Sequence, residues 1–254
     1  MNAIVLTFDI DWAPDFAIDF VARQLVRHQV RATWFVTHNS PAIERLRQHS
    51  ELFELGIHPN FLPGSTHGTT TAEVLDHCMR LVPEAFSVRT HCLFQSTPLL
   101  CDVLTRTPIR VDASLYLPHV RRLSVNELQW QGETLLRVPH FWEDDFEIER
   151  ITPCWSMAPL LAENDGLKVF DFHPIHVYLN SSTTDAYRQL KQKAASLSEV
   201  SEDQAAALAE TGSGAQTLFV ELTKHLSQAT KSLRMRDIHE HWRQGHFPAQ
   251  AEPQ

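Results

Sequence analysis

Two carboxylates, Asp9 and Asp11, stand two positions apart in the segment TFDIDW (7–12), at the end of an apolar run. Because side chains alternate along a strand, both carboxylates are expected to face the same way. Two carboxylates at such a short separation repel each other unless a cation or an arginine lies between them. An N-cap for the following helix would need only one acid, and Asp15 is better placed for that. The pair therefore indicates a functional site.

Two histidine-bearing segments follow, GIHPN (56–60) with His58 and GSTHG (64–68) with His67. Imidazoles and a carboxylate that meet at strand ends can bind zinc and leave one position open for water. Taken alone, either histidine could equally be a solvated loop residue. The second segment also resembles a nucleophile elbow, but threonine holds its middle position and Pro63 precedes it where a strand is needed. A serine hydrolase is therefore excluded.

Three further polar segments are placed where strands are expected to end. In RTH (89–91), Arg89 would be costly to bury without a carboxylate, which Asp9 could supply, and a surface arginine is the alternative. The segment PHFWEDD (139–145) puts aromatic rings beside acids. In FDFHPIH (170–176), Asp171 and His173 fall on one side of a strand.

The elements that must position these residues alternate along the chain. Short apolar runs predict buried parallel strands at 3–8, 32–36, 53–57, 86–90, 108–112 and 167–172. Helical spacing predicts helices at 15–29, 42–48, 72–81, 97–105, 184–197 and 217–229. This alternation is typical of βαβ units around a parallel sheet, whose active sites lie at the carboxyl ends of the strands.

Composition excludes several classes of protein. The 254 residues include 22 Lys and Arg against 31 Asp and Glu, and a net charge of −9 argues against nucleic-acid binding. No window of 18 apolar residues predicts a membrane span. The first residues lack the basic region of a signal peptide, and the four cysteines lack CxxC spacing, so a cytoplasmic protein is expected. We expect one domain over residues 1–245 and a frayed tail over 246–254.

Taken in order, these segments resemble a known family. LTFDID (6–11), RATWFV (31–36), a histidine-bearing loop, an arginine segment, a Trp–Asp segment and FHP (172–174) are similar to the polysaccharide deacetylases, the NodB-homology carbohydrate esterases. The resemblance covers residues 3–180. It implies an α/β fold, a distorted (β/α) barrel with seven strands, and here a cytosolic branch of the family.

The resemblance also implies the catalytic residues. Asp9 matches the base, and Arg89 matches the arginine that keeps the base ionised and oriented. His173 matches the general acid. Asp144 matches the acid that tunes this histidine, although Asp145 could fill the same place.

For the metal, the resemblance implies Asp11 and two histidines, of which His58 matches the first. Many members space these histidines as HxxxH, whereas nine positions separate His58 from His67 in this chain. His67 is the expected third ligand, through a loop shaped by prolines and glycines, and His91 is the alternative. The substrate-binding residues implied at the mouth of the site are Trp142, His38 and His91.

The function implied is a metal-dependent hydrolase that removes an acetyl group from an N-acetylated, or O-acetylated, sugar or glycan precursor. Its cofactor would be a divalent ion, zinc first. Its substrate would be a cytosolic saccharide, lipid- or nucleotide-linked. Two alternatives stay open, a metal-independent allantoinase-like amidase for a cyclic ureide or imide, and an inactive carbohydrate-binding barrel. The presence of Asp9, Arg89 and His173 together favours an enzyme, because binding alone needs no acid and base.

Overall fold

The computed structural model describes residues 3–162, 166–228 and 232–247. Its central strand is β1 (Ala3–Asp9), in which every residue is buried. Parallel neighbours flank it, β2 (Ala32–Val36) on one side and β9 (Leu167–Phe172) on the other, and β10 (Ser232–Leu233) pairs with its first half. A strand covered on both faces needs a continuous apolar sequence, which is what residues 3–8 supply.

One sheet runs through the molecule in the order β6-β7-β5-β4-β3-β2-β1-β9-β8, with β10 beside β1. Along this path only the β6–β7 pair is antiparallel. The strands not yet introduced are β3 (Phe53–Ile57), β4 (Ser87–Val88), β5 (Val111–Asp112), β6 (Asn126–Trp130), β7 (Glu133–Arg137) and β8 (Trp142–Glu143). The sheet curls into a half-barrel, which confirms the α/β fold of the NodB type.

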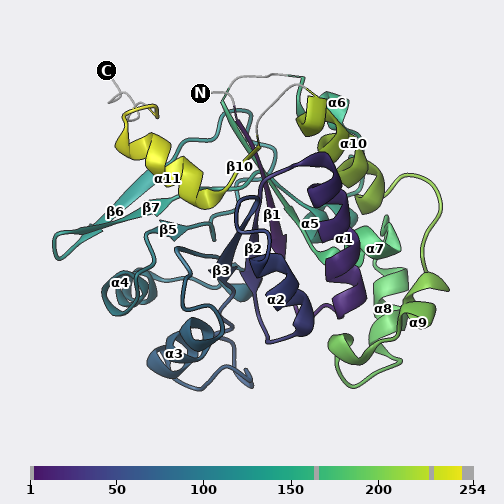
Figure 1. The fold of residues 1–254 in the computed structure, drawn as a ribbon, viewed down its shortest axis with the longest axis horizontal. Coiled ribbons are helices and arrows are strands. Elements are labelled where there is room, and N and C mark those ends of the chain that lie inside the picture. Colours follow the sequence, from purple (N-terminus) through teal and green to yellow (C-terminus); the bar gives the residue numbers. More distant parts are fainter. Residues whose placement is uncertain (1–2, 163–165, 229–231, 248–254) are drawn as a thin grey trace.

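The expectation of seven strands is wrong, because the described sheet has nine strands on its path besides β10. Much of the difference comes from the β6–β7 hairpin, which projects from one edge of the sheet (Figure 1). Gln131 and Gly132 form its two-residue turn with φ of 52° and 83°, as such tight hairpins require. β6 is mostly exposed, so it lacks the apolar run by which the other strands were predicted.

Helices cover the sheet in two groups (Figure 1). One group is formed by α1 (Asp15–His28), α7 (Pro174–Leu179) and α10 (Ala215–Gln228), which contact one another at the right of Figure 1. The second group is formed by α3 (Thr71–Leu81) and α4 (Thr97–Arg106), at the lower left of the same view. The remaining helices are α2 (Pro41–Arg47), α5 (Asp144–Ile148), α6 (Met157–Leu160), α8 (Asp185–Lys191), α9 (Glu202–Ala206) and α11 (Met235–Arg243).

The helix expected over 184–197 is shorter than predicted, since α8 ends at Lys191 and a separate 3₁₀ turn spans Leu197–Glu199. Ser196 precedes that turn in an extended conformation, with φ of −132° and ψ of 146°, so helical geometry does not continue through it. Serine is common at such positions because its hydroxyl offers the backbone alternatives to helical hydrogen bonds.

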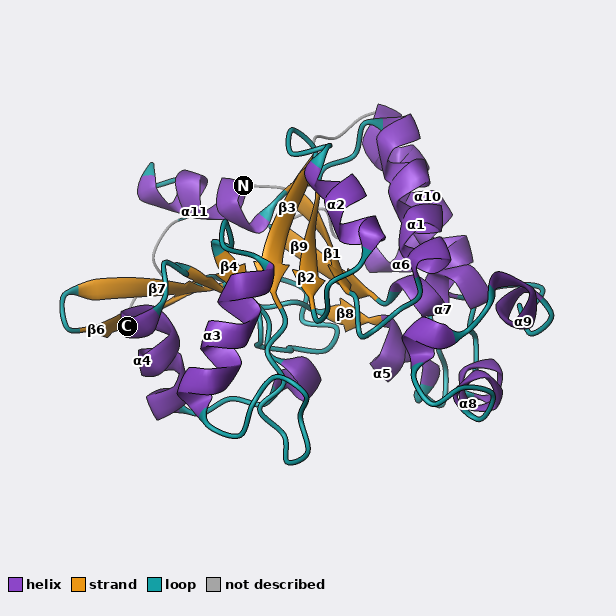
Figure 2. Ribbon diagram, turned by 60° about the horizontal axis from the view of Figure 1, so that its bottom comes forward, coloured by secondary structure: helices purple, strands orange, loops and turns teal. Residues whose placement is uncertain are grey.

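The strands present their carboxyl ends to a common side of the sheet, where α5 and α8 also lie (Figure 2). None of the described helices is long and apolar enough to cross a membrane. The single domain over 1–245 stays a prediction. Most of the tail expected to fray, residues 248–254, lies outside the described residues.

Candidate active site

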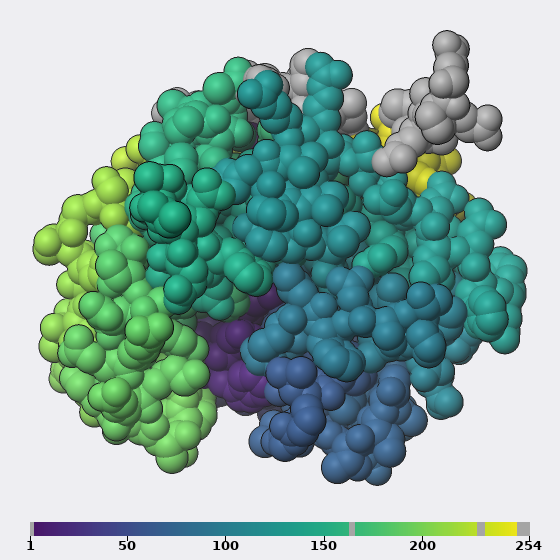
Figure 3. Space-filling model, turned by 180° about the vertical axis from the view of Figure 1, so that it is seen from behind, coloured from purple at the N-terminus to yellow at the C-terminus, as the bar shows by residue number. Residues whose placement is uncertain are grey.

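A cleft of about 750 Å³ opens at the carboxyl ends of the strands. Figure 3 shows it as a hollow in which purple atoms of the first residues are visible between a green wall and a blue wall. Its floor and walls include five of the ten candidate site residues, Asp9, Asp11, His58, His91 and His173, together with Glu143 and Asp145. The chemistry expected at separate strand ends therefore meets in one place.

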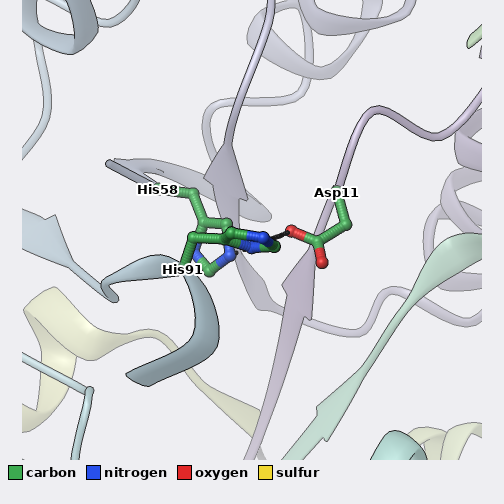
Figure 4. A group of neighbouring side chains, drawn as sticks. All are labelled: Asp11, His58 and His91. Carbon is green, nitrogen blue, oxygen red and sulfur yellow. Dashed lines mark hydrogen bonds and ion pairs between the residues drawn. The ribbon is translucent and has the colours of Figure 1, made fainter. Parts of the chain in front are cut away.

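Asp11, His58 and His91 form a group whose potential ligand atoms all lie within 4.8 Å of one another (Figure 4). Asp11 Oδ1 lies 3.0 Å from His58 Nε2 and 3.1 Å from His91 Nδ1. The three residues follow β1, β3 and β4 respectively. One carboxylate and two imidazoles are a donor set that suits zinc and leaves positions open.

The surroundings of this group prepare it for a cation. His58 Nδ1 lies 2.7 Å from the carbonyl oxygen of Arg89 and donates to it, which leaves Nε2 with its lone pair facing Asp11. Burial would raise the pKa of Asp11, but when the nitrogens of His58 and His91 that face Asp11 carry protons, their hydrogen bonds outweigh burial and hold the pKa of Asp11 well below its usual value. Asp11 therefore stays ionised, as a metal ligand must.

The structure does not bring His67 into this group. Its Nε2 lies 2.8 Å from the carbonyl oxygen of Thr37, and its Nδ1 accepts a hydrogen bond from the backbone N–H of Asn60 at 3.1 Å. Both ring nitrogens are thus used to fasten the loop after β3, and no lone pair is left for a metal. The histidine that lies beside Asp11 and His58 is His91, the alternative considered from the sequence.

His67 is buried, and burial lowers its pKa to about 4. Between pH 6.5 and about 4 the unfolded chain binds a proton that the folded chain does not, so stability should fall as the pH falls through this window. We expect this histidine to account for up to about 3 kcal/mol of that loss over the whole window, of which about 2 kcal/mol falls between pH 7.5 and 5.0. In His67→Ala the stability lost on acidification should be smaller by the contribution of this histidine. At pH 7.5 the variant should be less stable than the wild type by about 1–3 kcal/mol, because the backbone groups of Thr37 and Asn60 lose their hydrogen-bond partner.

Urea unfolding of metal-free protein at pH 7.5 and 5.0, with chelator present, checks this expectation without a contribution from metal release. The exposed His246 provides the matched control, because His246→Ala should follow the wild-type pH dependence. An unaltered pH dependence in His67→Ala would contradict the assignment.

Arg89 is fully buried and joins two carboxylates. Its Nη1 lies 3.0 Å from Asp9 Oδ1 and also pairs with Asp171 Oδ1, while its Nε donates to the carbonyl oxygen of Ala113 at 3.0 Å. The carboxylate partner that the sequence analysis suggested for Arg89 is therefore in place. Arg89 leaves Asp9 Oδ2 facing the metal group, 3.6 Å from His58 Nε2.

Asp171 was noted in the sequence but given no role. It lies fully buried between Arg89 and Thr7, whose Oγ1 donates to it at 2.7 Å. Burial raises the pKa of Asp171, against the pull of Arg89. The alternation along β9 puts Asp171 and His173 on one face, and this signal was sufficient to find it.

His173 is fixed by Asp144, which contacts it twice. His173 Nδ1 lies 2.7 Å from Asp144 Oδ1, and its backbone N–H donates to Oδ2 at 2.8 Å. Its other ring nitrogen, Nε2, faces the cleft, 3.6 Å from Asp11 Oδ2 and 3.8 Å from Asp145 Oδ2. Burial alone would lower the pKa of His173, but the carboxylates, first Asp145 and then Asp144, raise it well above its ordinary value.

Two acids next to Asp144 also line the cleft, Glu143, which had no expected role, and Asp145, which was the alternative to Asp144. Glu143 Oε2 lies 2.8 Å from His140 Nε2, and burial raises the pKa of Glu143 well above its usual range. Asp145 pairs with His176 Nε2 at 2.7 Å. His173 is thus surrounded by carboxylates on the side of the cleft.

Trp142 and His38 are placed differently from their expected roles at the mouth. Trp142 is fully buried and packs on Trp155 and Phe172 at ring distances of 5.9 and 4.8 Å, so its ring does not line the cleft. His38 is half-buried beside Thr37 and is not among the described lining residues. The aromatic side chains that do line the cleft are Phe146 and Tyr187.

One protein family and two solved structures are similar to this chain. The chain matches the family of WbmS-like polysaccharide deacetylases over residues 6–191. It is similar to a crystal structure from Bordetella bronchiseptica of a candidate polysaccharide deacetylase involved in O-antigen biosynthesis. That similarity has 33% identity and a TM-score of 0.76, and it covers 88% of this chain and 90% of the other.

A 4-alpha-glucanotransferase from Thermococcus litoralis is similar in fold alone, with 9% identity and a TM-score of 0.53 over 94% of this chain and 38% of that one. No curated protein matches the chain. The first two findings carry the assignment, because both extend over most of the chain. The chain belongs to the WbmS-like polysaccharide deacetylase family and is a carbohydrate deacetylase.

Proposed function

We propose that this chain is a divalent-metal-dependent deacetylase that hydrolyses the N-acetyl group of a sugar. One observation carries the proposal. The group Asp11–His58–His91 shares a cleft with two acid–base residues held in different environments, Asp9 beside Arg89 and His173 beside Asp144. Two titratable groups with opposite surroundings are the usual arrangement for removing one proton and supplying another near neutral pH.

Asp11, His58 and His91 would hold the ion, and the donor set together with the fixed tautomer of His58 fits zinc. When bound, a divalent ion supplies Lewis acidity, which polarises the acetyl carbonyl and lowers the pKa of the attacking water. His67 has no part in this ligand set, since both of its ring nitrogens are engaged elsewhere.

Asp9 would act as the general base. Arg89 occupies its Oδ1, so Oδ2 remains to accept the proton of the attacking water. The same hydrogen bond fixes the direction of the carboxylate toward the metal group, where that water must lie. Geometry of this kind places the acceptor within reach of the proton before any chemistry starts.

His173 would act as the general acid. The carboxylates around it keep it protonated at neutral pH, and Asp144 holds Nδ1 so that the Nε2 proton points into the cleft. The nitrogen of the broken amide bond takes this proton and leaves as an amine, and acetate is the other product. Asp145 lies close enough to stabilise the charged imidazolium.

The substrate class follows from the relative in Bordetella bronchiseptica, which is described as involved in O-antigen biosynthesis. We extend this to a glycan precursor, lipid- or nucleotide-linked, that is modified in the cytoplasm. All four cysteines are free, which suits a reducing compartment. Phe146 and Tyr187 would provide the ring faces against which the sugar packs, in place of Trp142.

Acetate release from N-acetylated sugars tests the proposal. The probes are UDP-linked N-acetylhexosamines and free N-acetylhexosamine oligomers, offered to protein loaded with zinc. We expect acetate to appear, to stop after treatment with a chelator, and to return when zinc is added. Full activity in metal-free protein would overturn the metal dependence and favour the amidase alternative, and no acetate from any probe would contradict the deacetylase assignment.

A further inference from the structure

Helix α8 presents one polar face to the cleft. The lining residues from this helix and its two flanking positions recur at helical spacing and are Thr184, Tyr187, Arg188, Lys191 and Gln192. The opposite face is apolar, since Ala186 and Leu190 are buried in a separate cluster with Ile175 and Leu179. The packing of that apolar face therefore determines which residues of α8 line the cleft.

Both basic residues of α8 lie on the cleft face. Arg188 and Lys191 are exposed, and Arg188 Nη2 lies 4.0 Å from Glu149 Oε1, while Lys191 Nζ lies 5.2 Å from the centre of the Tyr187 ring. Neither contact neutralises the positive charge of Arg188 or Lys191, because an ion pair at that distance between exposed side chains is weak. The two cations are thus available to a ligand in the cleft.

The rest of the cleft is acidic, with carboxylates contributed by Asp9, Asp11, Glu143, Asp145 and Glu149. Among the described residues that line it, Arg188 and Lys191 are the lysine and arginine side chains present. Arg89 lies beneath the floor and is already shared by Asp9 and Asp171. An anionic ligand would be attracted to the α8 wall, and this attraction would orient the ligand in the cleft.

We propose that the sugar deacetylated here carries an anionic group, a carboxylate or a phosphate, which Arg188 and Lys191 bind. The inference rests on the proposed deacetylase function and adds the charge of the substrate. The guanidinium of Arg188 matches the planar oxygen pairs of either group, and Lys191 adds a second positive charge one helical turn away. With the anion on the green wall of Figure 3, the sugar ring lies over the floor and its acetyl group reaches the metal group.

The test compares the kinetics of the zinc-loaded protein on three substrates. The probes are an N-acetylated hexuronic acid, an N-acetylhexosamine 1-phosphate and the neutral methyl glycoside of an N-acetylhexosamine. We expect kcat/KM to be higher for at least one anionic probe than for the neutral one, and the better anionic probe identifies the group. Added salt should raise KM for that probe and leave the neutral probe unaffected.

The double variant Arg188→Gln, Lys191→Gln should lower the ratio of kcat/KM between the anionic and neutral probes by about five- to tenfold, mainly through KM. Glu149→Gln should raise the ratio, because it removes the carboxylate nearest to Arg188. Lys193→Gln is the matched control, since Lys193 is exposed two positions further on but does not line the cleft. Equal kcat/KM for all probes, or a preference that survives in the double variant, would overturn the inference.

Calorimetric binding of the same probes separates this inference from the proposed function. Binding that favours the anionic probe and depends on Arg188 and Lys191, with no acetate released from any probe, would uphold the charge assignment and refute the deacetylase. Acetate released from all three probes without regard to charge would uphold the deacetylase and refute the charge assignment.

Discussion

The His91→Ala variant is expected to lose its divalent metal and its activity together, whereas His67→Ala should keep both. His91 Nδ1 lies 3.1 Å from Asp11 Oδ1 and belongs to the only group that joins Asp11 and His58 among the described clusters. Removing one of three protein ligands should weaken zinc binding by more than about 100-fold, the upper end of what loss of an outer partner costs. In His67→Ala the ligand set is untouched, and only the fastening of the loop is lost.

Zinc content after dialysis, followed by titration with zinc in a competing chelator, measures the difference directly. Each variant serves as the matched control of the other, since each loses one imidazole from the neighbourhood of Trp12. If His67→Ala lost the metal and His91→Ala kept it, the ligand set expected from the sequence would be right and the one drawn from the geometry would be wrong.

The difference between His91 and His67 shows which part of a metal site the sequence can predict and which part it cannot. His58 and His91 each come within three residues of a strand end, so the direction of the sheet positions them. His67 lies nine residues beyond His58, in a loop whose path depends on contacts such as those with Thr37 and Asn60. Such contacts exist only in the folded chain, and no spacing rule predicts which ring of several will reach the ion.

The sequence does not by itself show which of the neighbours Trp142 and Glu143 faces the cleft. Neighbouring residues of a strand point to opposite faces, so Trp142 and Glu143 cannot both line the cleft. The acid faces the site and the indole therefore packs in the core, against Phe172 and Trp155. The same alternation correctly placed Asp171 on the same side of its strand as His173.

The strands that were predicted with the correct bounds have a strong local signal in the sequence. The buried strands β1, β2, β3 and β9 each have a mostly apolar sequence, and each begins and ends within one residue of its predicted range. β6 and β7 lack such a run, and β8 has two residues, so pairing with neighbours rather than composition decides their conformation.

The Asp9→Asn variant is expected to keep its metal and lose turnover by about 10²–10⁴-fold, as loss of a general base typically does. Asparagine has nearly the same shape, and its oxygen can still accept the hydrogen bond that Arg89 Nη1 gives to Oδ1 at 3.0 Å. Its amide nitrogen would then take the place of Oδ2, next to the metal group, where it cannot accept a proton from water. The defect should therefore appear in kcat.

Metal analysis and acetate-release kinetics on the same preparation separate this defect from a loss of the ion. Asp19→Asn is a suitable control, because Asp19 is a carboxylate of α1 that pairs with Arg45 at the surface, away from the cleft. Asp171 remains beside Arg89 in Asp9→Asn, and the loss of the Asp9 charge, which raises the pKa of Asp171, favours its ionised form. The buried guanidinium therefore keeps one anionic partner, and the fold should persist. Turnover near the wild-type rate with full zinc would mean that Asp9 is not the base, and Glu143, the other buried carboxylate on the cleft, would be the next residue to replace.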